Sequence, residues 1–93
     1  MTVTVRLFAT LRLALGRGVV TVDAEGPITV RALLDRVSTA VGSDVTPWLL
    51  DDEGKIDRGT MILVGGRNVL HLAGLETEVD AAEVAVFPPA GGG

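Results

Sequence analysis

The 93-residue sequence has no cysteine and no tyrosine, and it has a single histidine, His71. Without a thiol the chain can form neither a disulfide nor a thiolate metal site, and it has no Cys–His pair for nucleophilic catalysis. A lone histidine near a turn is more often structural or solvated than catalytic. We therefore do not expect an enzyme that works with its own side chains, and the lack of cysteine fits a reducing cytoplasm.

Phe8, Trp48 and Phe87 are the only aromatic residues, and twelve acidic residues outnumber eight basic ones, for a net charge of −4. This balance disfavours nucleic-acid binding, which needs a basic surface, and so few rings do not form a base-stacking platform. No apolar run approaches the ~20 residues that cross a bilayer, and the alternating pattern after Met1 is not that of a secretion signal. We expect a cytoplasmic protein that binds neither nucleic acid nor membrane.

Two short motifs are interpreted as turns rather than as chemical sites. Asp51, Asp52 and Glu53 precede Gly54, and no other sequence feature converges on them, so a solvated loop is favoured over a metal site. The pair at residues 65–66 is Gly-Gly and lacks the Lys-Ser/Thr that completes a phosphate-binding loop. It predicts a β-hairpin instead.

The first half of the chain predicts two strands and one long helix within a single domain, which we place at residues 1–88. Polar and apolar residues alternate over residues 2–8, and a second strand is expected at residues 19–22. Apolar residues recur at helical spacing over residues 30–41, with Thr29 able to cap the start and glycine following the end.

The second half predicts strands at residues 60–64, 67–70 and 83–87, so that two hairpins flank the helix. A crossover through a helix is expected to be right-handed. The simplest closed arrangement puts the first and last strands side by side and parallel at the sheet centre. The expected class is α+β, with a mixed sheet of four to five strands and one main helix packed on one face.

The last strand is followed by Pro88, Pro89 and Ala90, and then by Gly91, Gly92 and Gly93. Proline ends a strand and stiffens the chain, whereas glycine loses the most backbone freedom on ordering. We expect a rigid root and a thin, flexible tail at residues 89–93. Fully extended, residues 90–93 would reach roughly 13–14 Å, enough to enter a channel that excludes side chains.

In order along the chain, these segments resemble the MoaD/ThiS family of sulfur carriers. The resemblance is carried by the opening Val3-Thr4-Val5-Arg6-Leu7-Phe8-Ala9-Thr10-Leu11-Arg12, by Thr29-Val30-Arg31-Ala32-Leu33-Leu34, by Ile62-Leu63-Val64-Gly65-Gly66-Arg67-Asn68-Val69 and by the terminal Phe87-Pro88-Pro89-Ala90-Gly91-Gly92-Gly93. It covers nearly the whole chain and is closest to the small subunit of molybdopterin synthase. It implies the ubiquitin-like β-grasp fold. The family usually has an Asp-Gly turn where this chain has Asp80-Ala81-Ala82, which leaves the type of that turn open.

The resemblance also implies a chemistry centred on the Gly93 carboxylate. A partner enzyme adenylates this group with ATP and magnesium, and sulfur displaces AMP to give a thiocarboxylate that donates sulfur, most naturally to molybdopterin. The implied partners are an adenylating enzyme of the MoeB/ThiF type and a sulfur-accepting synthase such as the large subunit of molybdopterin synthase. Alternatives are sulfur transfer to cysteine, thiamin or another thio-metabolite, and conjugation to protein lysines in the manner of a ubiquitin-like modifier. No cofactor is expected to be bound by the chain itself.

Partner binding is expected on the face of the sheet that the helix leaves open. Phe8 and Phe87 alternate away from their buried neighbours and are predicted to contact partners there, together with Pro88 and Pro89. The alternative is that Phe87 completes the core. Trp48 is interpreted as a core side chain beside the helix rather than as a partner contact.

Overall fold

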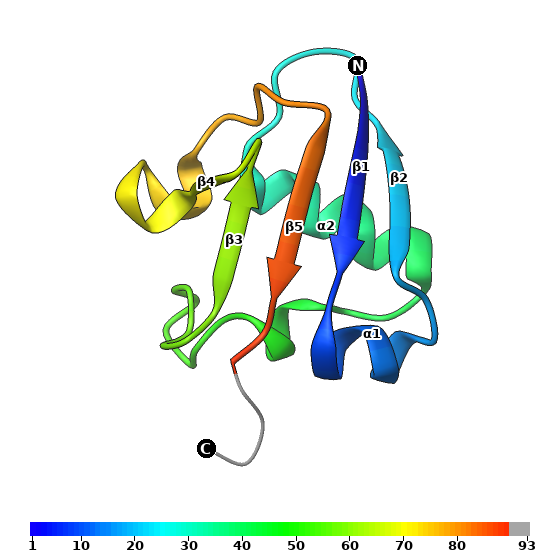
Figure 1. Cartoon of the computed structure of the whole chain (residues 1–93), viewed down its shortest axis with the longest axis vertical. Helices are drawn as coiled ribbons and strands as arrows, with labels where there is room; N and C mark the ends of the chain where they lie inside the picture. The colour runs from blue at the N-terminus through cyan, green and yellow to red at the C-terminus, as the bar shows by residue number, and fades with distance from the viewer. Residues whose placement is uncertain (90–93) are drawn as a thin grey trace.

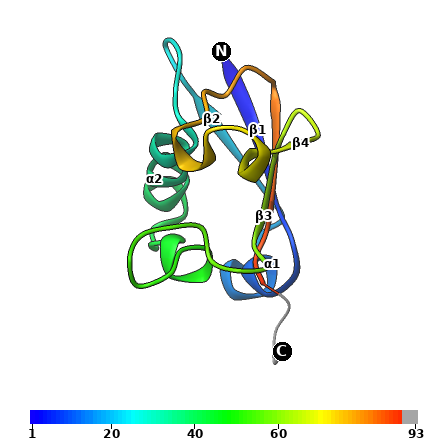
Figure 2. The same cartoon turned by 90° about the vertical axis from the view of Figure 1, so that its left-hand side faces the viewer.

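The computed structural model describes residues 1–89, which form a sheet with one long helix, α2, packed across one face (Figure 1). In the side view, no helix of residues 1–89 covers the opposite face of the sheet, and the short helix α1 lies below the lower end of the sheet (Figure 2). The α+β class, the five-stranded mixed sheet and the single main helix are therefore as predicted. Within these residues, no helix has the length and apolar character needed to span a membrane.

The sheet has the order β2-β1-β5-β3-β4, and its first and last strands in sequence lie side by side. Strand β1 (Thr2–Leu7) is parallel to β5 (Glu83–Phe87) and antiparallel to β2 (Val19–Asp23). Strand β3 (Met61–Val64) runs antiparallel to β5 on its other side, which makes β5 the central strand. The predicted parallel pairing at the sheet centre is confirmed.

Both α-helices end at glycine, and α2 also has a side-chain cap. Helix α2 (Val30–Val41) begins where the Thr29 hydroxyl accepts a hydrogen bond from the Ala32 amide at 3.1 Å, and Gly42 ends it at a φ of 73°. Helix α1 (Ala9–Leu15) links β1 to β2 and ends at Gly16. The capping residues read from the sequence for α2 are thus confirmed.

The segment after β3 differs in part from the prediction. Gly65 and Gly66 form the expected hairpin, but β4 (Arg67–Asn68) is only two residues long. The Asn68 side chain accepts a hydrogen bond from the Leu70 amide at 3.0 Å and so starts a 3-10 helix, η2 (Val69–His71), where the sequence suggested more strand. A second such turn, η3 (Gly74–Glu76), leads toward β5.

The core lies between α2 and the covered face of the sheet. It combines alternate residues of the strands with one stripe of α2, and its largest fully buried members include Leu7, Leu11, Leu33, Leu34, Leu49, Ile62, Val3, Val5, Val20, Val30, Val37 and Val45. Trp48 is not among them, so its interpretation as a core side chain is wrong. It lies in the 3-10 helix η1 (Thr46–Trp48) and is 39% exposed, while the adjacent Leu49 occupies the core instead.

Candidate functional site

The site begins where the chain leaves the central strand. Beyond β5, Pro88 is buried and Pro89 is half-buried. Pro89 lies against the turn before β3, since its Cβ is 3.5 Å from the position that a Cβ on Gly59 would take. The predicted firm root is present, and the burial of Pro88 makes it part of that root rather than an exposed partner contact. The predictions for Ala90, Gly91, Gly92 and Gly93 fall outside the described residues.

Phe8 and Phe87 lie together on the open face beside this root. Their rings are stacked, with centroids 4.3 Å apart and planes inclined by 6°. Both side chains are half-buried, whereas Leu7 and Val86, which precede them in the sequence, point into the core. Phe87 therefore does not complete the core, and the prediction from strand alternation holds for the positions of both rings.

The backbone of β1 explains how Phe8 reaches Phe87. The Phe8 amide donates to the Val86 carbonyl at 3.2 Å, which extends the parallel β1–β5 pairing by one residue. Ala9 then turns the chain into α1 with a φ of 53°, the left-handed region that residues with a Cβ rarely adopt. This strained turn holds α1 at the end of the sheet and leaves Phe8 on the open face.

Three further apolar side chains extend the stacked pair into a continuous surface. Met61 is the cross-strand partner of Phe87, and Leu63 is the partner of Ala85 one row further along the sheet. All are half-buried. We call this surface the open-face patch and define it by Phe8, Met61, Leu63, Ala85 and Phe87.

A charged pair borders the open-face patch. Arg6 lies beside Ala85 in the β1–β5 register, and its Nε donates to the Glu83 carboxylate at 2.7 Å. Both side chains are more than half exposed, so the pair contributes little to stability. The pair marks the boundary of the apolar surface, which therefore lies at the end of the sheet nearest the chain exit.

Met61 and Leu63 are not among the partner contacts predicted from the sequence. Both alternate with the buried Ile62 and Val64, so their face could have been read from the strand pattern. Their place beside Phe87 could not, because it depends on the register between two strands that are not adjacent in the sequence.

No three His, Cys, Asp or Glu side chains among residues 1–89 are placed to share a metal ion, and His71 is exposed. The pKa of Asp44 lies below its ordinary value, because its carboxylate accepts hydrogen bonds from the Thr46 amide and hydroxyl. This contact lies at the start of η1 and outside the open-face patch, so the candidate site is a binding surface at a chain exit.

Comparison with known proteins gives a consistent picture. The sequence model of the ThiS family matches residues 5–93. Over the full length of both chains, the sequence is 36% identical to a protein of Archaeoglobus fulgidus to which a sulfur-carrier role is provisionally assigned.

Two solved structures share the fold and nearly the whole chain. The small archaeal modifier protein 1 of Haloferax volcanii is 29% identical, with a TM-score of 0.77 and coverage of 96% of this chain and 98% of that one. A chain of the BexX/CysO complex of Amycolatopsis orientalis is 31% identical, with a TM-score of 0.72 and coverage of 98% and 99%. The predicted β-grasp fold is therefore confirmed.

Proposed function

This chain belongs to the ThiS family of sulfur carriers and ubiquitin-like modifiers, and from that membership we propose that it carries sulfur as a thiocarboxylate on Gly93. The observation that carries the proposal is the chain exit. A segment ending in three glycines follows the central strand, and the buried Pro88 holds the chain where it leaves that strand. A firm root allows a partner to grip the domain while the narrow segment enters its active site.

The chemistry needs activation because a carboxylate is a poor electrophile. Attack of the Gly93 carboxylate on the α-phosphate of ATP releases pyrophosphate and forms an acyl adenylate. A persulfide sulfur on a partner then displaces AMP, and reductive cleavage of the resulting acyl persulfide by a thiol leaves the thiocarboxylate. ATP, magnesium and the catalytic groups belong to the partners, and glycine suits the position because a β-carbon would crowd the approach to the carboxylate.

The open-face patch is the surface that we assign to the adenylating enzyme and then to the sulfur-accepting synthase. It lies directly beside the chain exit, it is apolar, and it has a stacked aromatic pair at its exit end. Buried aromatic anchors of this kind commonly dominate the binding energy of an interface. A protein similar to this one is known as part of the BexX/CysO complex, which supports the expectation of a protein partner.

For the recipient of the sulfur we propose the dithiolene of molybdopterin, following the sequence resemblance to the small subunit of its synthase. In that role the chain would be the non-catalytic subunit of the synthase. Sulfur transfer to cysteine, thiamin or another thio-metabolite uses the same activated terminus and a different acceptor enzyme.

The test is to incubate the protein ending at Gly93 with ATP, magnesium, a MoeB/ThiF-type enzyme and a sulfur donor. We expect ATP–pyrophosphate exchange and a gain in intact mass equal to the difference between sulfur and oxygen, mapped to Gly93 by fragmentation. A variant with one phenylalanine appended after Gly93 is the matched control, and it should show neither signal while unfolding at the same temperature. Modification at an internal residue, or full activity of an untrimmed extended variant, would contradict the proposal.

A second function is conjugation, favoured by the similarity to small archaeal modifier protein 1. The same adenylate would then be attacked by a lysine amine, which forms an isopeptide bond and releases AMP. Supplying lysine-containing target proteins without a sulfur donor distinguishes the two fates. Covalent adducts that survive reduction indicate conjugation, whereas a thiocarboxylate that forms only with the sulfur donor indicates sulfur transfer.

A further inference from the structure

Strand β2 is the long free edge of the sheet, on the far side of β1 from the chain exit. Its five residues pair with β1 alone, whereas the other edge strand, β4, has only two residues. Unpaired edges of this length can accept an additional strand from another chain. The β2 edge is therefore a candidate surface for strand addition, apart from the chain exit and sulfur transfer.

The hydrogen-bond parity of the β1–β2 ladder shows which groups of the edge point outward. The Leu7 amide donates to the Gly18 carbonyl at 2.9 Å, and the Ala24 amide donates to the Met1 carbonyl at 2.8 Å. Hydrogen-bonded and non-hydrogen-bonded pairs alternate along an antiparallel ladder. Gly18 and Ala24 belong to bonded pairs, so the non-bonded positions of β2 are Val19, Thr21 and Asp23. The amides and carbonyls of these three residues point away from β1.

Within residues 1–89, a single contact occupies this outward row. The Arg36 guanidinium, from α2, donates to the Asp23 carbonyl at 2.7 Å. The amides of Val19, Thr21 and Asp23 and the carbonyls of Val19 and Thr21 have no partner among the described residues. All three residues are exposed, so these five groups are available to a short extended segment.

A groove runs along the edge between β2 and α2. It has a volume of about 250 Å³ and is lined by Thr21, Val22, Asp23, Arg36, Thr39 and Ala40. A strand added to β2 would place alternate side chains over this groove. Because Val22 and Ala40 form the apolar part of the lining, a side chain entering the groove is expected to be small and apolar.

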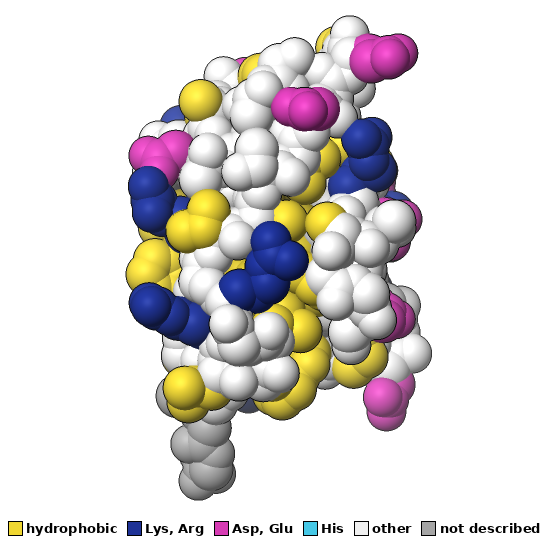
Figure 3. Space-filling view, turned by 90° about the vertical axis from the view of Figure 1, so that its right-hand side faces the viewer, with side chains coloured by type: hydrophobic (Ala, Val, Ile, Leu, Met, Phe, Trp, Pro, Cys, Tyr) yellow, Lys and Arg dark blue, Asp and Glu magenta, His cyan; other side chains and the backbone are white. Residues whose placement is uncertain are grey.

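Basic groups surround the start of the edge. Residues 1–22 contain Arg6, Arg12 and Arg17 and no acidic residue, although the protein as a whole is acidic. The Arg12 guanidinium packs over Gly18, where a Cβ would lie 3.0 Å from its Nε. Figure 3, which faces this side of the molecule, shows basic side chains among exposed hydrophobic ones, with the acidic side chains toward the margins.

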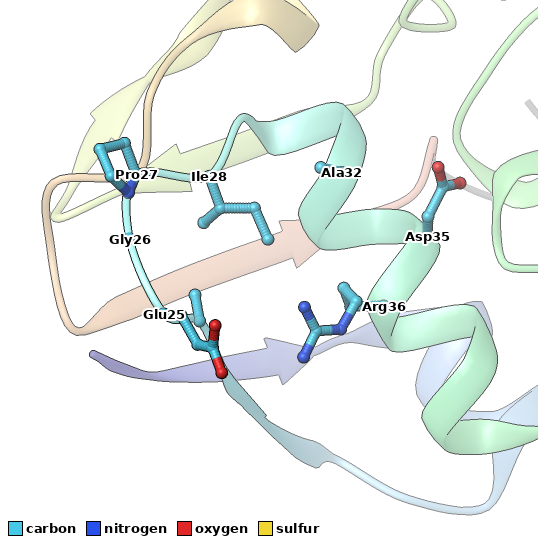
Figure 4. Close-up of a pocket in the computed structure, with 8 residues that line it drawn as sticks. Glu25, Gly26, Pro27, Ile28, Ala32, Asp35 and Arg36 are labelled. Carbon is cyan, nitrogen blue, oxygen red and sulfur yellow. The ribbon is translucent and has the colours of Figure 1, made fainter.

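The far end of the edge has a different character. Figure 4 shows the Arg36 side chain extending from α2 toward the loop after β2, which carries Glu25 and lines a separate cavity of about 350 Å³. The contact of Arg36 with the Asp23 carbonyl closes the edge at this end. Positive charge that faces an incoming segment is thus concentrated at the α1 end, near Arg12 and Arg17.

We propose that the β2 edge binds an extended peptide segment of a partner protein by strand addition, with small apolar residues over the β2–α2 groove and acidic residues beside Arg12 and Arg17. A second copy of this chain is a poorer occupant. Symmetric pairing about Thr21 would require the Asp23 carbonyl of each copy, which Arg36 already engages. Since β1 lies between this edge and β5, a bound segment lies away from the β5 and β3 members of the open-face patch, and the proposal stands independently of sulfur transfer.

The test uses the ¹⁵N-labelled protein and the peptide acetyl-Asp-Glu-Val-Ser-Val-Ser-Val-amide, followed by amide chemical shifts. We expect the Val19, Thr21 and Asp23 amides to shift, with saturation below about 1 mM. The same peptide with lysine in place of Asp-Glu should bind at least about threefold more weakly, the range of exposed charge pairs. Absence of binding, equal binding of both peptides, or shifts confined to the open-face patch would overturn the proposal.

Two pairs of variants separate edge binding from other effects. Thr21→Pro removes an amide that points outward, and an edge strand tolerates proline at such a position. This change should weaken peptide binding at least tenfold. Thr21→Val keeps the amide and should leave peptide binding unchanged. Arg17→Glu should weaken binding and Arg67→Glu, on the opposite edge, should not. Unchanged affinity of a folded Thr21→Pro variant would refute strand addition, and so would edge amides that shift with protein concentration alone, because that result identifies a second copy as the occupant.

Discussion

The two faces of the sheet are built from the same strands but differ in how far their side chains are buried. On the face toward α2, Leu7 and Val86 are at most 2% exposed and belong to the core. On the opposite face, the next residue of each strand, Phe8 and Phe87, is half-buried and stacked against its counterpart. Neighbouring positions should therefore separate folding from binding, because a shift of one residue along the strand moves a side chain from the core to the open face, which we propose as the partner surface.

The largest effect is expected on the covered face. Leu7→Ala should lower the free energy of unfolding by about 2–5 kcal/mol, because it removes a buried side chain and leaves a cavity between β1 and α2. Denaturant unfolding measures this loss. Affinity for the adenylating enzyme, expressed per folded molecule, should be unchanged, and a parallel loss of affinity would break the separation between the two faces.

The next effect is expected on the open face and concerns affinity. Phe87→Ala should weaken binding to the adenylating enzyme by about 2 kcal/mol, roughly thirtyfold, as for an aromatic hot spot. Its cost to folding should stay below the roughly 3–5 kcal/mol of a fully buried Phe, since the ring is half-buried. Titration calorimetry and thermal unfolding on one sample provide both values.

A smaller effect is expected where the chain passes from β1 to α1. Ala9→Gly should raise the free energy of unfolding by up to about 1 kcal/mol, because glycine adopts the positive φ without steric cost. Ala14→Gly, within α1, is the matched control and should lower it by about 0.5–1 kcal/mol. Equal destabilisation by both changes would show that the turn at Ala9 is not strained.

The smallest effect concerns pH and the side of the molecule away from the open-face patch. The pKa of Asp44 is lowered in the folded state by its hydrogen bonds to Thr46. Its stabilising contribution is therefore complete above the unfolded pKa and is lost as the pH falls through the folded pKa. The melting temperatures of wild type and Asp44→Ala should differ at neutral pH and converge once the pH falls below the folded pKa of Asp44, which lies under the ordinary value of an aspartate.

Most of the fold could be predicted because it follows from local patterns. Alternation located β1 and β5, the Thr29 cap and Gly42 bounded α2, and the pairing of first and last strands was expected as the simplest closed arrangement of the sheet. The positions of Phe8 and Phe87 on one face also follow from alternation. Their stacking does not, because it depends on the extra β1–β5 hydrogen bond at Phe8.

The errors have local physical causes. In η1 successive side chains point in different directions, and the side chain that is buried in the core is Leu49 rather than Trp48. Strand β4 is short because the Asn68 side chain offers the Leu70 amide a partner outside the sheet. Periodicity alone does not reveal which of two adjacent side chains will be buried in a short turn. Nor does it reveal whether a side chain will bind a backbone amide that would otherwise pair in the sheet.

The pairing of β1 with β5 also has a consequence for biosynthesis. Thr4 pairs with Glu83 across most of the chain, so the central ladder cannot form until the last strand has been synthesised. A nascent chain that ends before Glu83 leaves β1 and β3 without their shared neighbour, and the stacked rings and the buried Pro88 are absent. The surface that we assign to the activating enzyme is therefore completed only once β5 and the proline that follows it have been synthesised.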